Sequence, residues 1–320
     1  MDVQHNFRQL SLFEQVEAGQ DHSPENGGVF SDPAFTNNRS VPIHRWVPWI
    51  AGFSSGFVRD ALSKYLSGKG SVLDPFAGVG TTLVEAALSG CSAVGFEINP
   101  YAVLACQVKI HADQVSIDKL VDEISRLQTF YHERLASGYE PHSTPPKGFA
   151  TRAAFYSPCV LRKVLIFLDF VSTINNHEIR KLFKVAFSST MVRYSNYSYE
   201  PSLGRRASVG KSEILDFAVL QTIVDKLIEM AEDIEWYRAS VPGKSNAHVI
   251  RDSFFKYRDY IPPESFDLII TSPPYLNNYH YNRNTRPQLY WLGCVEQAKD
   301  LKPLEDSNFG KYWQTVRDKE

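Results

Sequence analysis

Cysteine is scarce in this sequence, and no arrangement of the cysteines suggests a metal site or a disulfide framework. Only four occur among 320 residues, and no two of them have CxxC spacing. Such scarcity excludes a disulfide-rich scaffold and is typical of proteins in a reducing compartment. We therefore expect a cytoplasmic protein that holds no metal.

Long apolar runs and a strong charge imbalance are also absent. No run approaches the roughly 18 apolar residues of a membrane helix, and the N-terminal residues lack the apolar core of a signal peptide. We therefore expect no membrane association. The 34 Lys and Arg residues against 36 Asp and Glu leave a net charge of −2. This balance argues against a globally basic nucleic-acid binder, so any DNA contact must use local patches.

A short apolar stretch, residues 266–270, leads into Thr271-Ser272-Pro273-Pro274-Tyr275, which we call the acceptor turn. The stretch predicts a buried strand, and the two prolines fix φ and remove two N–H donors. The turn thus presents carbonyl oxygens that no local N–H group claims, beside an aromatic stacking surface. A flat ring with an exocyclic amino group would fit there. The alternative is a proline-terminated strand in an ordinary loop.

Residues 71–82 combine a strand, a glycine turn (residues 75–80) and the start of a helix near Thr81, and residues 93–97 predict a second strand. In an open parallel sheet the ligand lies at the carboxyl ends of the strands. Gly78 and Gly80 let the backbone approach that ligand, and Glu97 can accept both hydroxyls of a ribose. The pattern is neither G-x-G-x-x-G nor a P-loop with its lysine. We therefore expect a nucleoside ligand without a phosphate chain.

Together, Asp-Pro-Phe-x-Gly-x-Gly-Thr-Thr and Ser-Pro-Pro-Tyr resemble the motifs of the S-adenosylmethionine-dependent DNA amino-methyltransferases, which methylate N4 of cytosine or N6 of adenine. The resemblance covers residues 41–110 and 246–295. It implies an α/β fold with a Rossmann-like methyltransferase sheet, S-adenosyl-L-methionine as cofactor, and double-stranded DNA with a flipped base as substrate. The Ser-Pro-Pro form is commoner among N4-cytosine enzymes, so cytosine is favoured, within a restriction–modification system.

The resemblance also assigns roles to individual residues. The implied cofactor-binding residues are Asp74, Phe76, Ala77, Gly78, Gly80, Thr81, Glu97, Asn99 and Asp252. Glu97 would hold the ribose. Residues 248–253 resemble the third strand, and Asp252 within them would accept the adenine amino group. The implied catalytic residues are Ser272, Pro273, Pro274 and Tyr275. Ser272 and the Pro273 carbonyl would draw the amino nitrogen toward sp³ geometry, while Tyr275 stacks on the base. Residues 43–54 resemble the segment that precedes the cofactor motif in some of these enzymes, and an amphipathic helix through Phe57, Leu62 and Tyr65 is expected after it.

The remaining segments suggest a division of the chain. Residues 1–40 predict a flexible arm, 41–110 with 246–320 the catalytic domain, and 111–245 a mainly helical insertion without strand–turn–strand patterning. Apolar residues recur at helical spacing from Ile117 to Leu127, and further helices are expected at 160–174 and 214–237.

Two segments, residues 192–211 and 279–286, interleave basic, aromatic and small polar residues. This composition suits contacts with phosphates and bases, although an ordinary solvated loop is the alternative. The expected DNA-contacting residues are Arg193, Arg205, Arg206, Lys211, His280, Arg283 and Arg286.

The sequence after the acceptor turn predicts two helical pieces, 287–295 and 308–316, joined by a charged linker, and no further strands. We therefore expect four strands, and a sheet that a second polypeptide completes in a split enzyme. A truncated form of a longer single-chain enzyme is the alternative explanation. The rival functions are N6-adenine or RNA-base amino methylation, and a non-catalytic DNA-recognition subunit.

Overall fold

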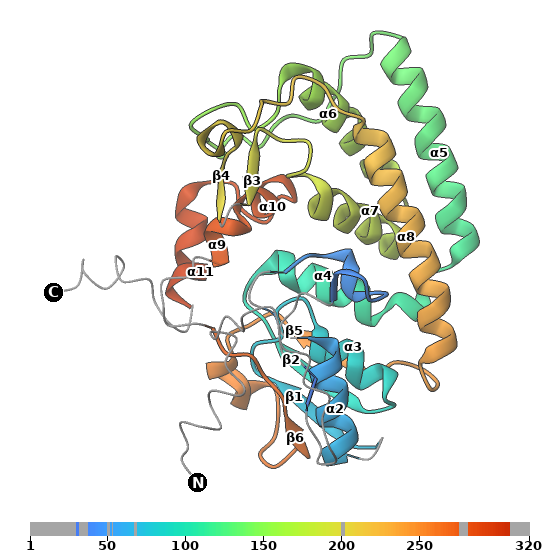
Figure 1. The fold of residues 1–320 in the computed structure, drawn as a ribbon, viewed down its shortest axis with the longest axis vertical. Helices are drawn as coiled ribbons and strands as arrows, with labels where there is room; N and C mark the ends of the chain where they lie inside the picture. The colour runs from blue at the N-terminus through green and yellow to red at the C-terminus, as the bar shows by residue number, and fades with distance from the viewer. Residues whose placement is uncertain are drawn as a thin grey trace, which may run out of the picture.

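The structure is a computed structural model that describes residues 30–31, 38–49, 52, 54–66, 69–199, 202–274 and 281–307. Most of the expected N-terminal arm, Tyr275, His280 and the expected helical piece at 308–316 lie outside these residues. In Figure 1 a parallel sheet with its helices occupies the lower part of the molecule, and long helices form a layer above it.

The main sheet has four described strands, all parallel, in the order β5-β2-β1-β6. They are β1 (Ser71–Asp74), β2 (Ser92–Phe96), β5 (Ala247–Ile250) and β6 (Leu268–Ile269). In the register of the sheet, Leu73 of β1 lies beside Val94 of β2 and Ile269 of β6. The predicted α/β class with a Rossmann-like sheet is confirmed, because every apolar run predicted as a strand takes its place in one parallel sheet.

Local sequence explains where the helices beside the sheet begin. Gly80 precedes α3 (Thr81–Leu88) in a left-handed conformation with φ 84°. Before α4 (Pro100–Ile110), the Asn99 side chain accepts hydrogen bonds from the first free backbone N–H groups, and Pro100 occupies the first turn. Helix α3 packs against β1, β2 and β5, and α4 packs against β5.

Helix α2 (Ser55–Leu66) packs against α3, as the predicted amphipathic pattern requires. Leu62 is buried, Phe57 is partly buried against the core, and Tyr65 is exposed.

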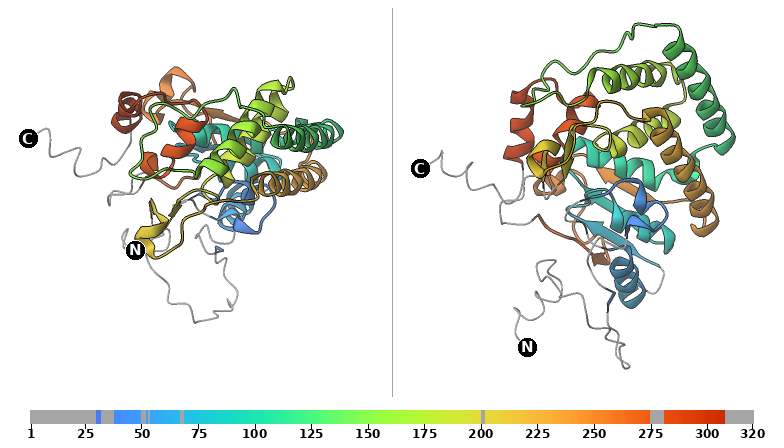
Figure 2. Two further views of the ribbon diagram at one scale, coloured as in Figure 1. Left: turned by 90° about the horizontal axis from the view of Figure 1, so that it is seen from above. Right: turned by 45° about the horizontal axis from the view of Figure 1, so that its top comes forward.

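The insertion is mainly helical, as predicted. It contains α5 (Ile117–Ala136), α6 (Pro158–Thr173), α7 (His177–Thr190) and α8 (Val219–Ser240), with the short helix η3 (Ala112–Gln114) before them. Helices α5 and α8 lie side by side in both views of Figure 2. On α5 the predicted Leu120, Ile124 and Leu127 are buried. Helix α7 was not predicted.

The expectation that residues 111–245 lack a strand–turn–strand element was wrong at one place. β3 (Tyr197–Tyr199) and β4 (Leu203–Arg205) pair antiparallel in a two-stranded sheet of their own, and the short helix η4 (Arg206–Val209) follows. Strands of three residues are too short to show the two-residue alternation on which the prediction depended.

The C-terminal part contains α9 (Tyr281–Asn284), α10 (Arg286–Trp291), η6 (Ala298–Leu301) and α11 (Lys302–Asp306). The charged linker expected between two helical pieces is therefore largely helical itself. Gln297 and Asp300 form a capping box that starts η6, and Pro303 lies in the first turn of α11. The capping box and the proline favour helix here more strongly than the charged composition favours an irregular linker.

A single cluster of buried apolar side chains runs from the sheet through α4 into the helical layer. On the outer strand β6, Ile269 is 60% exposed, so this edge of the sheet is uncovered by the described residues. No helix in the described ranges has both the length and the apolar character of a membrane span.

Candidate functional site

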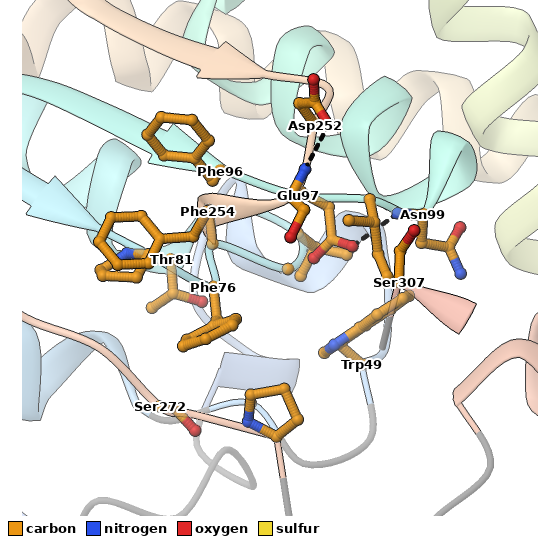
Figure 3. A pocket seen from close by; sticks show the side chains of 18 of the residues that line it. Trp49, Phe76, Thr81, Phe96, Glu97, Asn99, Asp252, Phe254, Ser272 and Ser307 are labelled. Carbon is orange, nitrogen blue, oxygen red and sulfur yellow. Dashed lines mark hydrogen bonds between the residues drawn. The ribbon is translucent and has the colours of Figure 1, made fainter. Parts of the chain in front are cut away.

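A pocket lies at the carboxyl ends of β1, β2 and β5, where a parallel sheet places its ligands (Figure 3). Its lining comes from six segments of the sequence. The lining residues are Trp49, Gly52, 75–79, Thr81, 96–99, 252–255, Ser272, Pro274 and Ser307. Of the predicted cofactor residues, only Asp74 and Gly80 are not in this lining.

Glu97 lies at the end of β2, and Figure 3 shows its carboxylate in the middle of the pocket. The backbone N–H of Asn99 donates to its Oε1 over 2.7 Å. Burial raises the pKa of Glu97 to about 7, although the backbone N–H groups of Asn99 and Gly78 favour the charged form. The pocket therefore contains a carboxylate that can accept hydrogen bonds and that titrates near neutral pH.

The two glycines of the glycine turn are required for different reasons. Gly78 lines the pocket at φ 51°, and a Cβ there would lie 3.2 Å from the indole nitrogen of Trp49. Gly80 faces away from the pocket, and a Cβ there would lie 2.5 Å from Cys106 Sγ. Gly78 therefore allows close approach at the pocket wall, whereas Gly80 allows α3 and α4 to pack together.

Asp74 is buried behind the pocket and connects the two motifs. Its carboxylate accepts hydrogen bonds from Thr82 Oγ1 over 2.6 Å and from Thr271 Oγ1 over 2.9 Å. Burial raises its pKa to about 6, while these hydrogen bonds favour the charged form. Asp74 thus shapes the pocket indirectly, by holding the glycine turn against the acceptor turn.

Aromatic rings form one wall of the pocket. The ring centroid of Phe254 lies 5.5 Å from that of Phe96 and 6.3 Å from that of Phe76. Phe254 begins the short helix η5 (Phe254–Asp259), and Phe255 lines the pocket beside it. Neither was predicted as a site residue, although two phenylalanines directly after the third strand were a usable signal.

Asp252 lies at the rim of the pocket on the side opposite Ser272 (Figure 3). Its carboxylate accepts hydrogen bonds from Tyr260 Oη over 2.7 Å and from Lys256 Nζ over 3.2 Å. The bond from Tyr260, followed by that from Lys256, lowers the pKa of Asp252 below its ordinary value. Asp252 is therefore an ionised acceptor at neutral pH.

Trp49, which was also not predicted as a site residue, follows a turn that α8 holds in place. Asp233 of α8 accepts hydrogen bonds from the Ile43 backbone over 2.7 Å and from Trp46 Nε1 over 2.9 Å, and it pairs with Arg45 over 2.6 Å. This anchors η2 (His44–Trp46), with Ile43 at φ 65°. The signal for Trp49 was its place in the segment that resembles the one before the cofactor motif.

The acceptor turn contributes Ser272 and Pro274 to the pocket, whereas Pro273 is exposed. Figure 3 shows Ser272 below Phe76, across the pocket from Asp252. The two motifs that the sequence separates by almost two hundred residues thus line one pocket. Among the residues that the structure describes, no group of three or more His, Cys, Asp or Glu side chains is arranged to hold a metal ion.

Six of the seven predicted DNA-contacting residues lie in the described part of the chain, all but His280, and they fall into two groups. Arg193, Arg205, Lys211 and Arg283 are exposed. Arg206 Nε donates to the Ser212 carbonyl, and Arg286 donates to the Ala150 carbonyl while its guanidinium lies over the Tyr290 ring. The last two therefore have structural partners within the chain.

The β3–β4 hairpin and the segment after the acceptor turn lie side by side (Figure 1). Tyr199 Oη donates to the Asn284 carbonyl over 2.9 Å, and the Leu203 backbone N–H donates to Asn284 Oδ1 over 3.1 Å. The two segments that the sequence singled out for DNA contact are therefore brought together.

One protein-family model matches part of the sequence. Residues 17–107, which include the glycine turn and Glu97, match the N6/N4 methyltransferase family model, described as DNA methylase. In sequence the chain is similar to the N4/N6 DNA amino-methyltransferases. The resemblance recognised in its sequence motifs is thereby confirmed.

Curated relatives of this family match most of the chain. The Type II methyltransferase M.BsoBI of Geobacillus stearothermophilus is 28% identical, and the match covers 82% of this chain and 55% of the relative. For M.MvaI of Kocuria varians the identity is 25%, over 74% of this chain and 54% of the relative. For M.AvaI of Nostoc sp. the identity is 24%, over 82% of this chain and 57% of the relative. The chain therefore spans about half the length of the curated relatives that it matches. No solved structure matches it.

The expected second polypeptide receives no support from these matches or from the part of the chain that the structure describes. Each curated relative is one chain that extends well beyond the matched region.

Proposed function

We propose that this chain transfers a methyl group from S-adenosyl-L-methionine to the exocyclic N4 of cytosine in duplex DNA. The observation that carries the proposal is that Glu97 and the glycine turn share one pocket with Ser272 and Pro274. A nucleoside site and an acceptor turn for an amino group thus adjoin, as a direct transfer between two substrates requires.

The residues of the pocket fit S-adenosylmethionine, which supplies a methyl group on a positively charged sulfur when bound. Glu97 can accept hydrogen bonds from the ribose hydroxyls, and Asp252 can accept one from the adenine amino group. The wall of Phe96 and Phe254 suits a flat heterocycle, and the ring faces of Trp49 and Phe76 suit a cation.

The acceptor turn would hold the target base. The Ser272 side chain and the carbonyl of Pro273 can accept hydrogen bonds from the target amino group, which exposes the lone pair of its nitrogen. Tyr275, in the part of the turn outside the described residues, would stack on the flipped base. No nucleophilic side chain is needed, so the chain contributes positioning and electrostatics. Ser at position 272 favours cytosine N4 over adenine N6.

Contact with DNA would come from the insertion and from the segment after the acceptor turn. The exposed Arg193, Arg205, Lys211 and Arg283 offer charges to phosphates around the acceptor turn. On this proposal residues 41–110 and 246–320 form the catalytic domain, and residues 111–245 contribute to target recognition. The names of the curated relatives support a role in modifying DNA within a restriction–modification system.

The test is a transfer assay with methyl-tritiated S-adenosylmethionine and unmethylated duplex DNA, followed by nucleoside analysis of the product. We expect N4-methylcytosine, and we expect Ser272→Ala to reduce its formation while the exposed control Ser137→Ala leaves it unchanged. N6-methyladenine as the only product would overturn the base assignment. The absence of any transfer would overturn the proposed function.

A further inference from the structure

A buried hydrogen bond joins the pocket to the far end of the segment that carries the acceptor turn. Asn99 Nδ2 donates to Thr285 Oγ1 over 2.8 Å, and the two residues are 3% and 7% exposed. Asn99 lines the pocket two residues after Glu97, and its backbone N–H holds the Glu97 carboxylate. Thr285 follows α9 and directly precedes α10.

The direction of this bond is fixed by the fold. Asn99 Oδ1 already accepts hydrogen bonds from the backbone N–H groups of Tyr101 and Ala102 at the start of α4. The amide of Asn99 therefore cannot flip without losing the helix cap, and its Nδ2 remains directed toward Thr285.

We call residues 271–285 the acceptor segment; the structure describes its two ends, 271–274 and 281–285, and each end is bonded to a residue beside the pocket. At the first end Thr271 donates to Asp74, behind the glycine turn, over 2.9 Å. At the second end Thr285 accepts from Asn99, beside Glu97. Two side-chain hydrogen bonds therefore connect the segment to the last residue of β1 and to the loop that follows β2.

The β3–β4 hairpin is attached at the same place. Asn284, which is 7% exposed, is bonded through its carbonyl to Tyr199 and through its side chain to Leu203. Gln288 Nε2, one turn along α10, donates to Tyr199 Oη over 3.2 Å. The loop after β2, the acceptor segment and the hairpin consequently meet at Asn284 and Thr285.

We infer that Thr285, through its hydrogen bond with Asn99, is a positioning residue that sets the acceptor segment at transfer distance from the cofactor. Thr285 is not among the residues that line the pocket, so it acts through Asn99 and through the chain on either side of it. A displacement of about 1 Å at the reacting atoms can slow a reaction about a hundredfold, which makes such a bond consequential. The inference rests on the proposed function.

The experiment compares Thr285→Val, which removes the hydroxyl at constant shape, with Thr285→Ser, which keeps it. Binding of S-adenosylhomocysteine is measured by calorimetry, and the single-turnover rate of methyl transfer is measured at saturating DNA. We expect the valine variant to keep its affinity for S-adenosylhomocysteine within about twofold and to lose about 10- to 100-fold in rate. The serine variant should recover most of that rate.

Two further variants make the assignment specific. Asn99→Ser keeps an acceptor for the start of α4, but its side chain is too short to reach Thr285. It should therefore slow methyl transfer as much as Thr285→Val does. The double variant Asn99→Ser/Thr285→Val should be no slower than either single variant. The matched control is Thr222→Val on α8. The Thr222 hydroxyl donates to the Ala218 carbonyl one turn earlier, away from the pocket, so this variant should transfer at the wild-type rate.

The other possible outcomes distinguish failure of this inference from failure of the proposed function. Wild-type rates for Thr285→Val would overturn the inference and leave the proposed function standing. A parallel loss of affinity and rate, or failure of serine to restore the rate, would overturn the positioning role in favour of a structural one. A wild-type chain without transfer would overturn the proposed function and this inference with it.

Discussion

Thr271 Oγ1 donates a hydrogen bond to Asp74 Oδ1 over 2.9 Å, and this bond connects the two sequence motifs of the pocket. Thr271 begins the acceptor turn, whereas Asp74 ends β1 and precedes the glycine turn. Because the same carboxylate also accepts from Thr82 at the start of α3, one buried group fixes a strand end, a helix start and the acceptor turn.

Removing the hydroxyl of Thr271 should loosen this connection. We expect Thr271→Val to lower the free energy of unfolding by about 0.5–1.5 kcal/mol and to raise the pKa of Asp74 further, because a bond to its charged form is lost. Urea denaturation measures the first effect. Thr271→Ser, which keeps the hydroxyl, is the matched control, and equal losses in both variants would contradict the explanation.

Cofactor affinity should depend on pH through Glu97, whose pKa burial raises to about 7. On the proposed function, the ionised carboxylate would accept hydrogen bonds from both ribose hydroxyls, so affinity should rise as the pH increases through this pKa. If binding requires the ionised form, the Kd for S-adenosylhomocysteine should fall up to about tenfold between about pH 6 and pH 8. Calorimetry across this range measures it.

Glu97→Gln separates this effect from other titrations in the pocket. The variant should bind S-adenosylhomocysteine more weakly, and its affinity should lose most of its pH dependence above pH 7. Asp74, with a pKa of about 6, would change the affinity only at lower pH. An undiminished pH dependence in Glu97→Gln would assign the titration to another group.

A methyl group at position 80 should destabilise the fold. Gly80 has φ 84°, which costs other residues about 1–2 kcal/mol, and its Cβ would overlap Cys106 Sγ at 2.5 Å, which adds about 1–3 kcal/mol of overpacking. Gly138→Ala is the control, because Gly138 has φ 69° but no atom within 4 Å of a new Cβ. Denaturation midpoints should fall clearly more for Gly80→Ala than for Gly138→Ala.

Asp233 should matter for both stability and cofactor binding. It is 2% exposed and accepts hydrogen bonds from Ile43, Arg45 and Trp46. Breaking such a buried pair costs about 3–5 kcal/mol, and the turn that precedes Trp49 would lose its anchor. We expect Asp233→Asn to unfold at lower urea and to bind S-adenosylhomocysteine more weakly. The partly exposed pair of Glu178 and Lys181 gives the control, and Glu178→Gln should change stability by less than about 1 kcal/mol.

The sheet and the pocket edge could be predicted from sequence because each depends on a local pattern. Residues 71–74 and 93–97 are apolar runs that end at turn formers or a carboxylate, and parallel strands bring such ends together. The pattern for α7 was also present, with Asn176 as cap and Ile179, Leu182 and Phe183 on one face, but it was not recognised.

Other features could not be predicted because they arise from contacts between distant segments. The bond between Asn99 and Thr285 joins residues 186 positions apart, and the anchoring of Ile43 by Asp233 joins residues 190 apart. Arg286 contacts Ala150 and Tyr290 instead of being free for DNA, and this too depends on where those two residues lie in the folded chain. Sequence periodicity carries no information about such pairings.

If one pocket holds the cofactor beside the acceptor turn, a crystal structure of the chain with bound S-adenosylhomocysteine should show it. We expect the ribose hydroxyls to bond to Glu97, the adenine to lie against Phe254, and the sulfur to face Ser272 and Trp49. A ligand bound outside this pocket, or one whose sulfur faces away from Ser272, would show that the pocket does not hold the cofactor in this way.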